Sequence, residues 1–279
     1  MTAQMMGALA RAALEAEVAL TPKPGLVDQR NNGAHDDMDL SLFLRSARTL
    51  EPWFCRFAEM GRQAPSSLQP DQLFASLRRP GRQAERDMYT ATGGVNTHKG
   101  VVFSLGLLCA AGGRLCSSGQ AVVSDALCQL AAEMTAGLCK RELPMQGGKY
   151  GAAGARGEAE SGFSTVRNIS LPRLREYLRD RLTLEESCLR TLLHLMATVR
   201  DTNLLSRGGV RQAQWVRNQA LWLSGHFSLD ALMDFDDQMI RRSLSPGGCA
   251  DLIAVTLFLW AIDTDITPQE LAKNIPIIR

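Results

Sequence analysis

The stretch from Thr92 to Cys109, TGGVNTHKGVVFSLGLLC, places reactive side chains directly before an apolar helix. Asn96 or Thr97 can cap that helix by accepting a hydrogen bond from a first-turn N–H. The remaining amides and the helix dipole favour an anion at this end, where His98 and Lys99 could supply a proton and a positive charge. The pattern GxxxxGK[ST] is absent, so the stretch is not a P-loop. A capped helix with incidental polar residues explains the stretch equally well.

A second reactive stretch, residues 21–39, reads TPKPGLVDQRNNGAHDDMD. Its prolines and glycines are typical of a rigid turn. Lys23 could hold a phosphate, and Asp28 and Asp37 could hold a hard cation, or one of them could act as a base. The alternative is a polar loop that ends in a helix N-cap.

A third stretch, residues 154–162, reads GARGEAESG. Arg156 could bind a phosphate with its guanidinium fork. Glu158 and Glu160 stand two residues apart, so they would share a face in an extended loop but not on a helix. A flexible lid is the alternative interpretation.

A fourth stretch, residues 201–209, reads DTNLLSRGG and follows a strong helix. A carboxylate at a helix C-terminus opposes the dipole, so Asp201 is expected to need a cation, either Arg207 or a metal. Asn203 offers a further oxygen, and Gly208 and Gly209 follow. An Asp–Arg pair that closes a turn is the alternative.

A fifth stretch begins at Ser245 and Pro246, which fit the N-cap and first position of a helix. Gly247 and Gly248 in the first turn are costly unless another group approaches the backbone closely. Asp251 then lies in a very apolar helix, where a carboxylate needs a partner or a cation. These features favour a functional interpretation.

Apolar residues recur at helical spacing along almost the whole chain, and convincing strand alternation is hard to find. The pattern predicts an all-α, single-domain bundle of about ten helices over residues 1–279, with the site built from interhelical loops. Residues 144–164 are expected to be mostly loop, and Asp234, Asp236 and Asp237 a solvated helix face. Helices are predicted over about 5–20, 40–50 (capped by Asp39), 71–79 (capped by Asp71), 82–91, 98–111, 120–139, 171–181, 183–200 (with a Thr183/Glu186 capping box), 210–224, 228–242, 246–262 and from 267.

Composition and charge narrow the class of protein. The 279 residues carry a net charge of +2, with the basic clusters scattered, so there is no signature of nucleic-acid binding. The seven cysteines form no CxxC pair and read as buried apolar residues in a reducing compartment. No signal peptide is recognisable, and the longest apolar run, 252–262, is too short to span a bilayer. We therefore expect a soluble, cytoplasmic protein that needs no membrane partner.

The five stretches, in this order, resemble the triphosphoribosyl-dephospho-coenzyme A synthase family. The resemblance covers most of the chain, and five ordered motifs are far more specific than any one of them. The motifs are Lys23-Pro24-Gly25-Leu26-Val27-Asp28, Gly33-Ala34-His35 with Asp37-Met38, Gly94-Val95-Asn96-Thr97-His98-Lys99-Gly100, Gly154-Ala155-Arg156-Gly157-Glu158-Ala159-Glu160, Asp201-Thr202-Asn203 with Arg207-Gly208-Gly209, and Ser245-Pro246-Gly247-Gly248 with Ala250-Asp251-Leu252. Residues 141–151 look shorter than the family's usual connection, and Asp36 receives no role.

The resemblance implies a reaction between ATP and 3′-dephospho-CoA that releases adenine. The 2′-hydroxyl of the dephospho-CoA ribose attacks C1 of the ATP ribose, and the triphosphate is retained. The product is the precursor of the prosthetic group of citrate lyase or malonate decarboxylase, which a separate transferase attaches to the acyl-carrier subunit.

This chemistry suggests roles for the motif residues. Base displacement at a ribose C1 passes through an oxocarbenium-like state that a nearby carboxylate stabilises, while the hydroxyl needs a general base and adenine a proton donor. We expect Mg²⁺ on Asp28, Asp37, Asp201 and Asp251, and catalysis by Glu158 or Glu160 in preference to His98, with His35 also a candidate. Substrate binding is expected from Lys23, Asn96, Thr97, Lys99, Arg156, Asn203, Arg207, Gly208, Gly209, Ser245, Gly247 and Gly248.

Two other classes compete with this interpretation. The dipeptide His35-Asp36 fits an all-α metal-dependent phosphohydrolase, but that class needs an upstream histidine and His35 is the first in the chain. It would release phosphate from ATP and no adenine. A non-catalytic nucleotide-binding protein would be stabilised by ATP without releasing adenine, but it has no need for so many carboxylates and cations in five loops.

Overall fold

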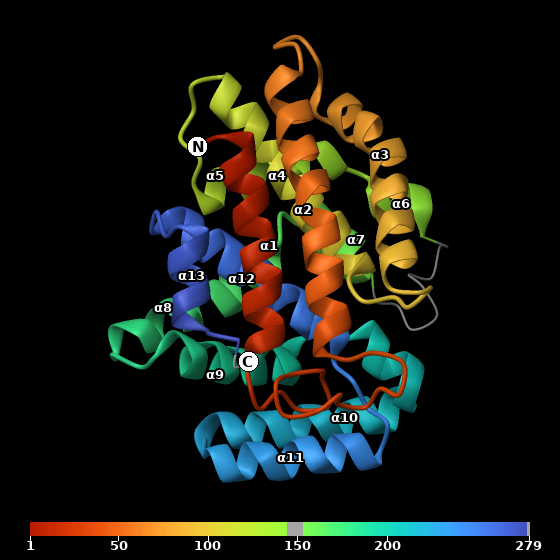
Figure 1. The fold of residues 1–279 in the computed structure, drawn as a ribbon, viewed down its shortest axis with the longest axis vertical. Helices are drawn as coiled ribbons and strands as arrows, with labels where there is room; N and C mark the ends of the chain where they lie inside the picture. Colours follow the sequence, from red (N-terminus) through yellow and green to blue (C-terminus); the bar gives the residue numbers. More distant parts are fainter. Residues whose placement is uncertain (144–152, 278–279) are drawn as a thin grey trace.

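A computed structural model describes residues 1–143 and 153–277, and the regular secondary structure of this part of the chain is entirely helical (Figure 1). The all-α prediction is confirmed, with more helices than expected because several connections contain short ones. The helices are α1 (Ala3–Ala19), α2 (Leu40–Gln63), α3 (Pro70–Ala91), α4 (Lys99–Ser117), α5 (Ser124–Thr135), α6 (Leu138–Glu142), α7 (Gly154–Glu160), a π-helix η1 (Val166–Ser170), α8 (Leu171–Arg179), α9 (Leu184–Thr198), α10 (Thr202–Gly225), α11 (Leu229–Arg241), α12 (Gly247–Asp263) and α13 (Pro268–Asn274).

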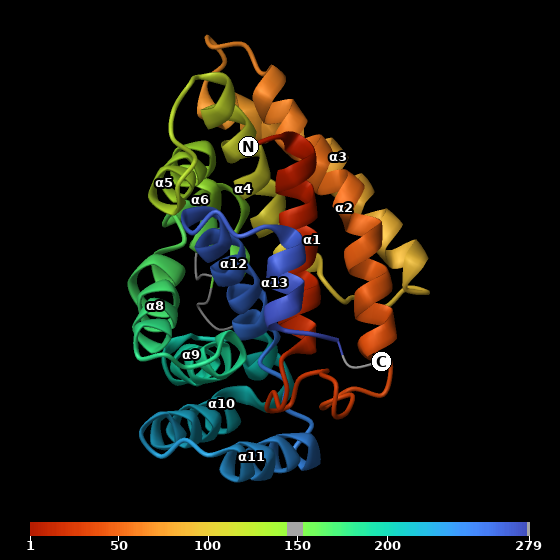
Figure 2. The ribbon, with the colours of Figure 1, turned by 60° about the vertical axis from the view of Figure 1, so that its left-hand side comes forward.

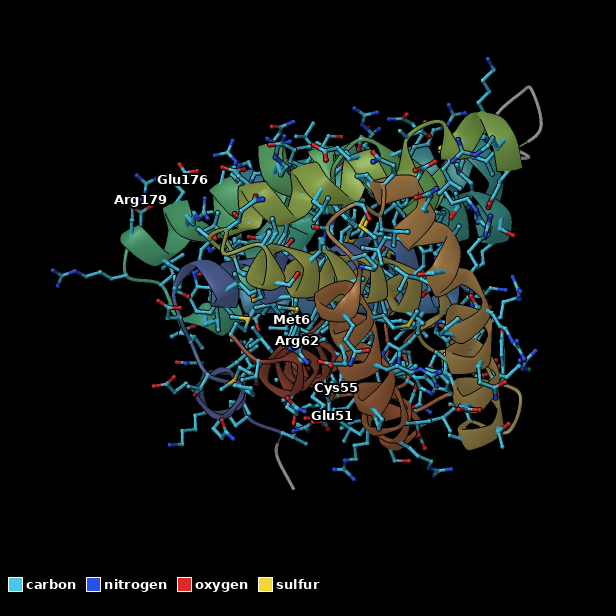
Figure 3. All side chains as sticks on the ribbon, turned by 90° about the horizontal axis from the view of Figure 1, so that it is seen from above. Met6, Glu51, Cys55, Arg62, Glu176 and Arg179 are labelled. Carbon is cyan, nitrogen blue, oxygen red and sulfur yellow. The ribbon has the colours of Figure 1, made fainter. Side chains whose placement is uncertain are left out.

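The long helices α1, α2 and α4 form the centre of the bundle. Helix α2 packs against both α1 and α4, and α12 packs against α1, α4 and α9. Figures 1 and 2 show α1 and α2 running along the long axis, with α10 and α11 lying across one end. Seen from above, Met6 of α1 and Cys55 of α2 lie in the region where these two helices meet, far from Glu176 and Arg179 of α8 (Figure 3).

Helix α4 does not stop at Gly112-Gly113 as predicted, but continues to Ser117. These glycines bring two helices together rather than ending one. A Cβ on Gly113 would lie 1.8 Å from the carbonyl oxygen of Ala58 in α2, and a Cβ on Gly61 would lie 1.9 Å from that of Ala110 in α4. Glycine is required where backbones approach so closely.

Helix α4 is also the one helix of the described residues with the length and hydropathy of a membrane span, a property that the sequence analysis assigned to none. However, 72% of its apolar window is buried inside the protein. A helix that is apolar all round and enclosed by others is typical of a protein core. The fold therefore accounts for its composition without a membrane.

Pro80 was expected to separate two helices, but residues 70–91 form the single helix α3. Its N-cap is Gln69, and Asp71 lies in the first turn. Proline removes one hydrogen bond from a helix interior, so packing must compensate. Helix α3 is strongly amphipathic and packs through Leu73, Phe74 and Leu77, which outweighs this local cost. Tertiary contacts here override propensity.

The predicted helix over 120–139 is broken into α5 and α6, because Gly137 adopts a φ of 72°. Residues 154–160, predicted as loop, form α7. The Asp39 and Thr183 caps are confirmed: Asp39 accepts from Leu42 N at 2.8 Å and Thr183 from Glu186 N at 3.2 Å. The Glu186 carboxylate binds Arg190, and the reciprocal half of the predicted capping box is not among the bonds of the described residues. Residues 144–152 of the predicted loop lie outside the described residues.

Candidate active site

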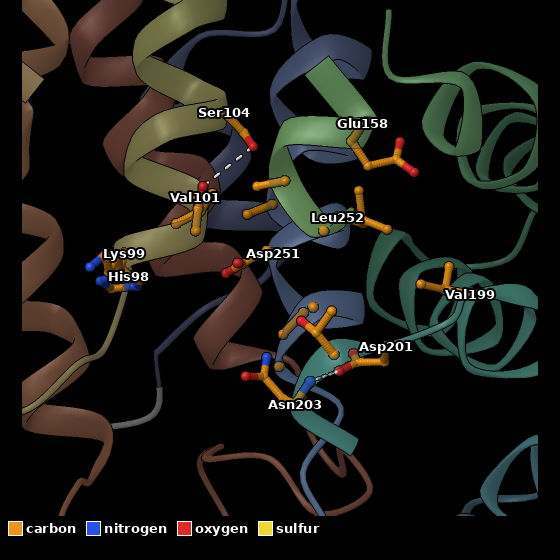
Figure 4. Close-up of a pocket in the computed structure, with 18 of the residues that line it drawn as sticks. His98, Lys99, Val101, Ser104, Glu158, Val199, Asp201, Asn203, Asp251 and Leu252 are labelled. Carbon is orange, nitrogen blue, oxygen red and sulfur yellow. Dashed lines mark hydrogen bonds between the residues drawn. The ribbon is translucent and has the colours of Figure 1, made fainter. Parts of the chain in front are cut away.

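All five reactive stretches contribute to the wall of one cavity of about 950 Å³. Figure 4 shows Asp251 between the start of α4 and the start of α10, with Glu158 on α7 across the opening. Most of the predicted site residues therefore come together as expected from the loop-built site. The four predicted residues that do not line the cavity are Asp28, Glu160, Gly208 and Gly209.

Asp28 organises the loop over residues 21–39 instead of facing the cavity. Its carboxylate accepts hydrogen bonds from Lys23 N at 2.8 Å, Thr21 Oγ1 at 3.0 Å, Arg30 N at 2.7 Å and Asn31 N at 3.0 Å. The side chain is buried. Its lone pairs are therefore occupied by the protein, which leaves the predicted metal role without a free oxygen.

Asp236 anchors the same loop to α11, and its assignment to a solvated face is wrong. The residue has no exposed surface. It accepts hydrogen bonds from Gly25 N and Asn31 Nδ2, each at 2.8 Å, and pairs with Arg30 at 2.5 Å. Burial raises the pKa of Asp236, and these donors partly offset that effect. The helical pattern of α11 did not reveal the role of Asp236, because its hydrogen-bond partners lie some 200 positions away in the sequence.

Lys23 is 2% exposed and forms an ion pair with Glu17 of α1. Its charge is thus already neutralised by a residue that the sequence analysis missed. Burial raises the pKa of Glu17, and the ammonium of Lys23 opposes that rise. A carboxylate among the apolar residues that end α1 was the available signal, because buried charges are paired in proteins. Lys23 lines the cavity, but as half of a buried pair rather than as a free phosphate ligand.

The turn before α4 holds its side chains through a network with α2. Asn96 Oδ1 accepts from Lys99 N at 3.2 Å, so the predicted capping bond is present although His98 occupies the N-cap position. Ser46 of α2 lies 2.7 Å from His98 Nδ1. Burial, with the nearby charge of Lys23, lowers the pKa of His98 to about 3, so the imidazole is neutral. Ser46 is a second residue that the sequence analysis missed.

Lys99 faces the cavity from α4, and Asp251 faces it from α12. The Lys99 side chain is 53% exposed and lies 3.6 Å from a Glu85 carboxylate oxygen. A Cβ on Gly100 would lie 2.2 Å from Asp251 Oδ2, so this glycine makes room for the carboxylate. Within the described residues, the carboxylate of Asp251 has no hydrogen-bond partner. Desolvation, with the charges of Glu17 and Asp201, raises its pKa well above the usual value.

Asp201 was predicted to lie at the C-terminus of the preceding helix, where the dipole would destabilise its carboxylate. Instead, it is the N-cap of α10. Its Oδ1 accepts from Asn203 N at 2.8 Å and Leu204 N at 3.1 Å, and its Oδ2 accepts from Cys249 N at 2.9 Å. The expected pair with Arg207 is therefore wrong, and three backbone N–H groups supply stabilisation that was expected from a cation. Burial raises the pKa of Asp201, and the three N–H donors oppose that rise.

The two glycines at the start of α12 are needed for close approach, as predicted. A Cβ on Gly247 would lie 2.7 Å from Asn203 Nδ2, and one on Gly248 would lie 2.9 Å from Asp201 Oδ2. The start of α10 therefore packs directly on the start of α12. Gly209, at a φ of 66°, kinks α10. Its role is conformational, since it does not line the cavity.

His35 is held between α10 and the start of α12. Its Nε2 lies 2.9 Å from Ser245 Oγ, and its Nδ1 lies 3.0 Å from Arg207 Nη2. Ser245 therefore contacts His35, and Pro246 rather than Ser245 is the N-cap of α12. Arg207 also donates to the carbonyl oxygen of Ala34 at 2.9 Å. Burial, followed by the charge of Arg207, lowers the pKa of His35.

Helix α7 separates its two glutamates. Glu158 lines the cavity, and its carboxylate accepts from Thr165 Oγ1 at 2.5 Å and Thr165 N at 3.3 Å. Burial raises the pKa of Glu158. Glu160 accepts from Cys139 N at 2.8 Å, and bonds to Cys139 lower its pKa.

Arg156 is half exposed at the cavity wall and lies 2.9 Å from a Glu142 oxygen.

The four predicted metal ligands do not form a cage. In the part of the chain that the structure describes, no three His, Cys, Asp or Glu side chains are placed to hold one ion. Asp28 and Asp201 use their oxygens on backbone N–H groups, whereas Asp251 and Asp37 do not. Asp37 is 63% exposed, and its Oδ1 lies 3.7 Å from His35 Nδ1.

Comparison with known proteins agrees with the motif resemblance. Residues 3–268 match the model of the ATP:dephospho-CoA triphosphoribosyl transferase family. A 2-(5''-triphosphoribosyl)-3'-dephosphocoenzyme-A synthase of Klebsiella pneumoniae is 46% identical over 92% of this chain and 90% of its own length. The synthase of the same name from Escherichia fergusonii is 45% identical over 90% and 88%. A probable synthase from Salmonella gallinarum is 44% identical over 92% and 90%.

No solved structure matches the fold. The sequence comparisons nevertheless extend over all five reactive stretches and the cavity that they form. The chain therefore belongs to the ATP:dephospho-CoA triphosphoribosyl transferase family.

Proposed function

We propose that this protein joins ATP to 3′-dephospho-CoA to give 2′-(5″-triphosphoribosyl)-3′-dephospho-CoA, with release of adenine. The observation that carries the proposal is the assembly of all five motifs around one cavity of about 950 Å³. That volume lies at the upper end of the range for small-molecule sites, which suits a reaction between two nucleotides. The relatives at 44–46% identity carry the name of this synthase activity.

The bond changes define what the site must supply. The 2′-oxygen of dephospho-CoA forms a bond to C1 of the ATP ribose, and the bond from C1 to adenine breaks. The hydroxyl proton passes to a base, and the leaving adenine gains a proton. An oxocarbenium-like C1 carries positive charge in the transition state, so a carboxylate beside it lowers the barrier.

We assign the general base to Glu158 rather than Glu160 or His98. Glu158 lines the cavity and has a raised pKa, which makes it a stronger base than an ordinary carboxylate. Glu160 is occupied by the backbone N–H of Cys139 and lies outside the cavity wall. His98 has a pKa of about 3 and is too weak a base near neutral pH.

We assign the triphosphate to the side of the cavity formed by the start of α4 and by Arg207. The free N–H groups and dipole of α4 favour an anion, and Lys99 adds a charge at its first turn. Arg207 faces the same cavity, and its position is held by Ala34 O and His35. Arg156 can reach a phosphate if it leaves Glu142, which would keep Arg78 as a second cationic partner.

Magnesium fits Asp251 and Asp37, the two predicted ligands whose carboxylates accept no backbone hydrogen bond within the described residues. Mg²⁺ is usually bound by one or two carboxylates together with phosphate oxygens and water, so no preformed cage is needed. Asp251, which has no hydrogen-bond partner in the described residues, and Asp37, at the exposed rim, are the ligands we propose. The ion would neutralise charge on the triphosphate.

The protein is proposed to act in the cytoplasm and to pass its product to a transferase that loads an acyl-carrier subunit. The rival phosphohydrolase is not supported. Its metal ligand would be His35, but both ring nitrogens of His35 are engaged, by Ser245 and Arg207. Family membership also argues against it.

Product analysis tests the proposed function. The protein is incubated with ATP and Mg²⁺, with and without 3′-dephospho-CoA, and the nucleotides are separated by chromatography. We expect adenine only when both substrates are present. Release of ADP or phosphate that does not depend on dephospho-CoA would instead indicate a hydrolase, and binding of ATP without any product would indicate a non-catalytic protein.

A further inference from the structure

A hydroxyl relay from the turn before α4 to α2 determines which nitrogen of His98 carries its proton. Thr97 Oγ1 donates to Ser46 Oγ at 2.8 Å, and Ser46 Oγ lies 2.7 Å from His98 Nδ1. A serine hydroxyl has one proton. Ser46 Oγ accepts from Thr97, and within the described residues its own proton has no hydrogen-bond acceptor other than Nδ1, so we assign Nδ1 as the acceptor. A neutral imidazole with Nδ1 as acceptor carries its proton on Nε2.

The Nε2–H group lacks a partner. His98 is 3% exposed, and Nε2 is buried without a hydrogen bond within the described residues. The ring is fixed in place by the edge of Phe43, with ring centroids 5.0 Å apart. Buried donors are almost always satisfied in native proteins, so an unpaired one needs an explanation. His98 is part of the cavity wall, which places this unused donor at the site where the substrates are proposed to bind.

We propose that Ser46 and Thr97 are positioning residues that hold His98 as the neutral Nε2–H tautomer, and that His98 binds a phosphate oxygen of ATP through this group. The assignment of ATP as the ligand rests on the proposed function, but the assignment of the His98 tautomer does not. A phosphate oxygen is favoured over a ribose oxygen because the adjacent Lys99 and the start of α4 attract negative charge. The positive charge of Lys23 favours the neutral imidazole, and the Glu17 carboxylate paired with Lys23 partly offsets that charge.

Nuclear magnetic resonance of ¹⁵N-histidine-labelled protein tests the tautomer directly. The chain has only four histidines, and His98→Gln identifies the signal of His98. We expect Nε2 to be protonated and Nδ1 not, without titration between about pH 6 and 8. In Ser46→Ala we expect both tautomers. Protonation of Nδ1 in the wild type, or titration in this range, would overturn the proposal.

The same spectrum identifies the acceptor when ligands are added one at a time. ATP and inorganic triphosphate should each shift the Nε2–H signal, and adenosine should not. A shift with adenosine but not with triphosphate would contradict the phosphate assignment. The absence of any shift would mean that a buried water satisfies Nε2, which would also overturn the proposal. These results do not depend on turnover, so they stand apart from a failure of the proposed reaction.

Two substitutions of His98 distinguish a role as hydrogen-bond donor from a purely structural role of the ring. The amide of His98→Gln can place an N–H where Nε2 was, whereas His98→Asn has one only near the Nδ1 position. We expect the KM for ATP to rise about ten- to hundredfold in His98→Asn, but much less in His98→Gln, with the pH profile of kcat/KM unchanged in both. Equal losses in two variants that melt like the wild type, or a lost limb in the pH profile, would contradict the donor role.

Discussion

Glu158 and Glu160 stand two residues apart on α7 but have different surroundings. The carboxylate of Glu158 reaches the cavity and is bound by Thr165, whereas that of Glu160 binds the first turn of α6 through Cys139 N. The helix explains this difference, since residues two apart on a helix do not share a face. Glu158 is thus the glutamate placed to accept a proton from a bound hydroxyl.

Replacing Glu158 with glutamine should slow adenine release by about a hundredfold or more, which is the usual contribution of a general base. The amide preserves the size of the side chain, so the melting temperature should change little. Glu160→Gln is the matched control and should retain most of the activity. Steady-state adenine release measures both. A Glu158→Gln variant with a near wild-type rate would remove Glu158 from the mechanism.

The raised pKa of Glu158 predicts an acid limb in the pH profile of kcat/KM. A base must be ionised, so activity should fall as the pH drops through a pKa that lies above the ordinary 4.5. The hydrogen bonds from Thr165 favour the ionised form. Thr165→Val should therefore raise this pKa further and move the limb to higher pH, while Glu160→Gln should leave it in place. A limb that is unmoved in Thr165→Val, or moved to lower pH, would be inconsistent with this assignment.

Single residues also show where sequence reasoning succeeds. Gly247 and Gly248 were expected to allow a close approach, and they do, because a glycine pair in a first turn has few other uses. Asp201 was assigned to the wrong end of a helix, since the pattern did not reveal that α10 begins immediately after α9. Glu17 and Ser46 were missed because their partners, Lys23 and His98, were known only as members of separate motifs.

At the scale of helices, the contact between α2 and α4 positions the anion-binding end of α4. The two helices meet at glycines, where no side chain separates their backbones. The sequence predicted α4 correctly at its start but ended it at these glycines. Glycine ends a helix and also permits helices to touch, and a single sequence does not distinguish the two uses.

Gly113→Ala should destabilise the protein by about 1–3 kcal/mol, the usual cost of forcing extra volume into a packed interior. The new Cβ would overlap the carbonyl oxygen of Ala58. Gly81→Ala in α3 is the control: no atom lies within 4 Å of its Cβ position, so the free energy of unfolding should be unchanged or about 0.5–1 kcal/mol higher. Urea unfolding compares the two variants. Equal stabilities would contradict the close packing of α2 and α4.

At the scale of the whole molecule, one cavity collects residues from positions 14 to 254. The sequence predicted that five connections would meet, because their reactive residues exceed what folding needs. It could not predict which oxygens remain free, since that depends on hydrogen bonds between distant segments. Asp28 and Asp201 are used by the backbone, and Asp251 is not.

Binding of ATP at this cavity should stabilise the whole fold in a magnesium-dependent way. A ligand at a hundred times its Kd adds about 2.7 kcal/mol to the free energy of unfolding. We expect ATP with Mg²⁺ to raise the melting temperature, and removal of the metal with a chelator to reduce this shift. Asp251→Asn should weaken the metal dependence. A shift that is the same with and without the chelator would exclude Mg²⁺ from ATP binding.

The most direct test of the central claim follows the fate of the γ-phosphate. ATP labelled at this position is incubated with the protein, 3′-dephospho-CoA and Mg²⁺, and the products are separated and weighed by mass spectrometry. We predict that the label appears in a dephospho-CoA adduct carrying a triphosphoribosyl group, in an amount equal to the adenine released. Label recovered as inorganic phosphate, or adenine released without the labelled adduct, would contradict the proposed transfer.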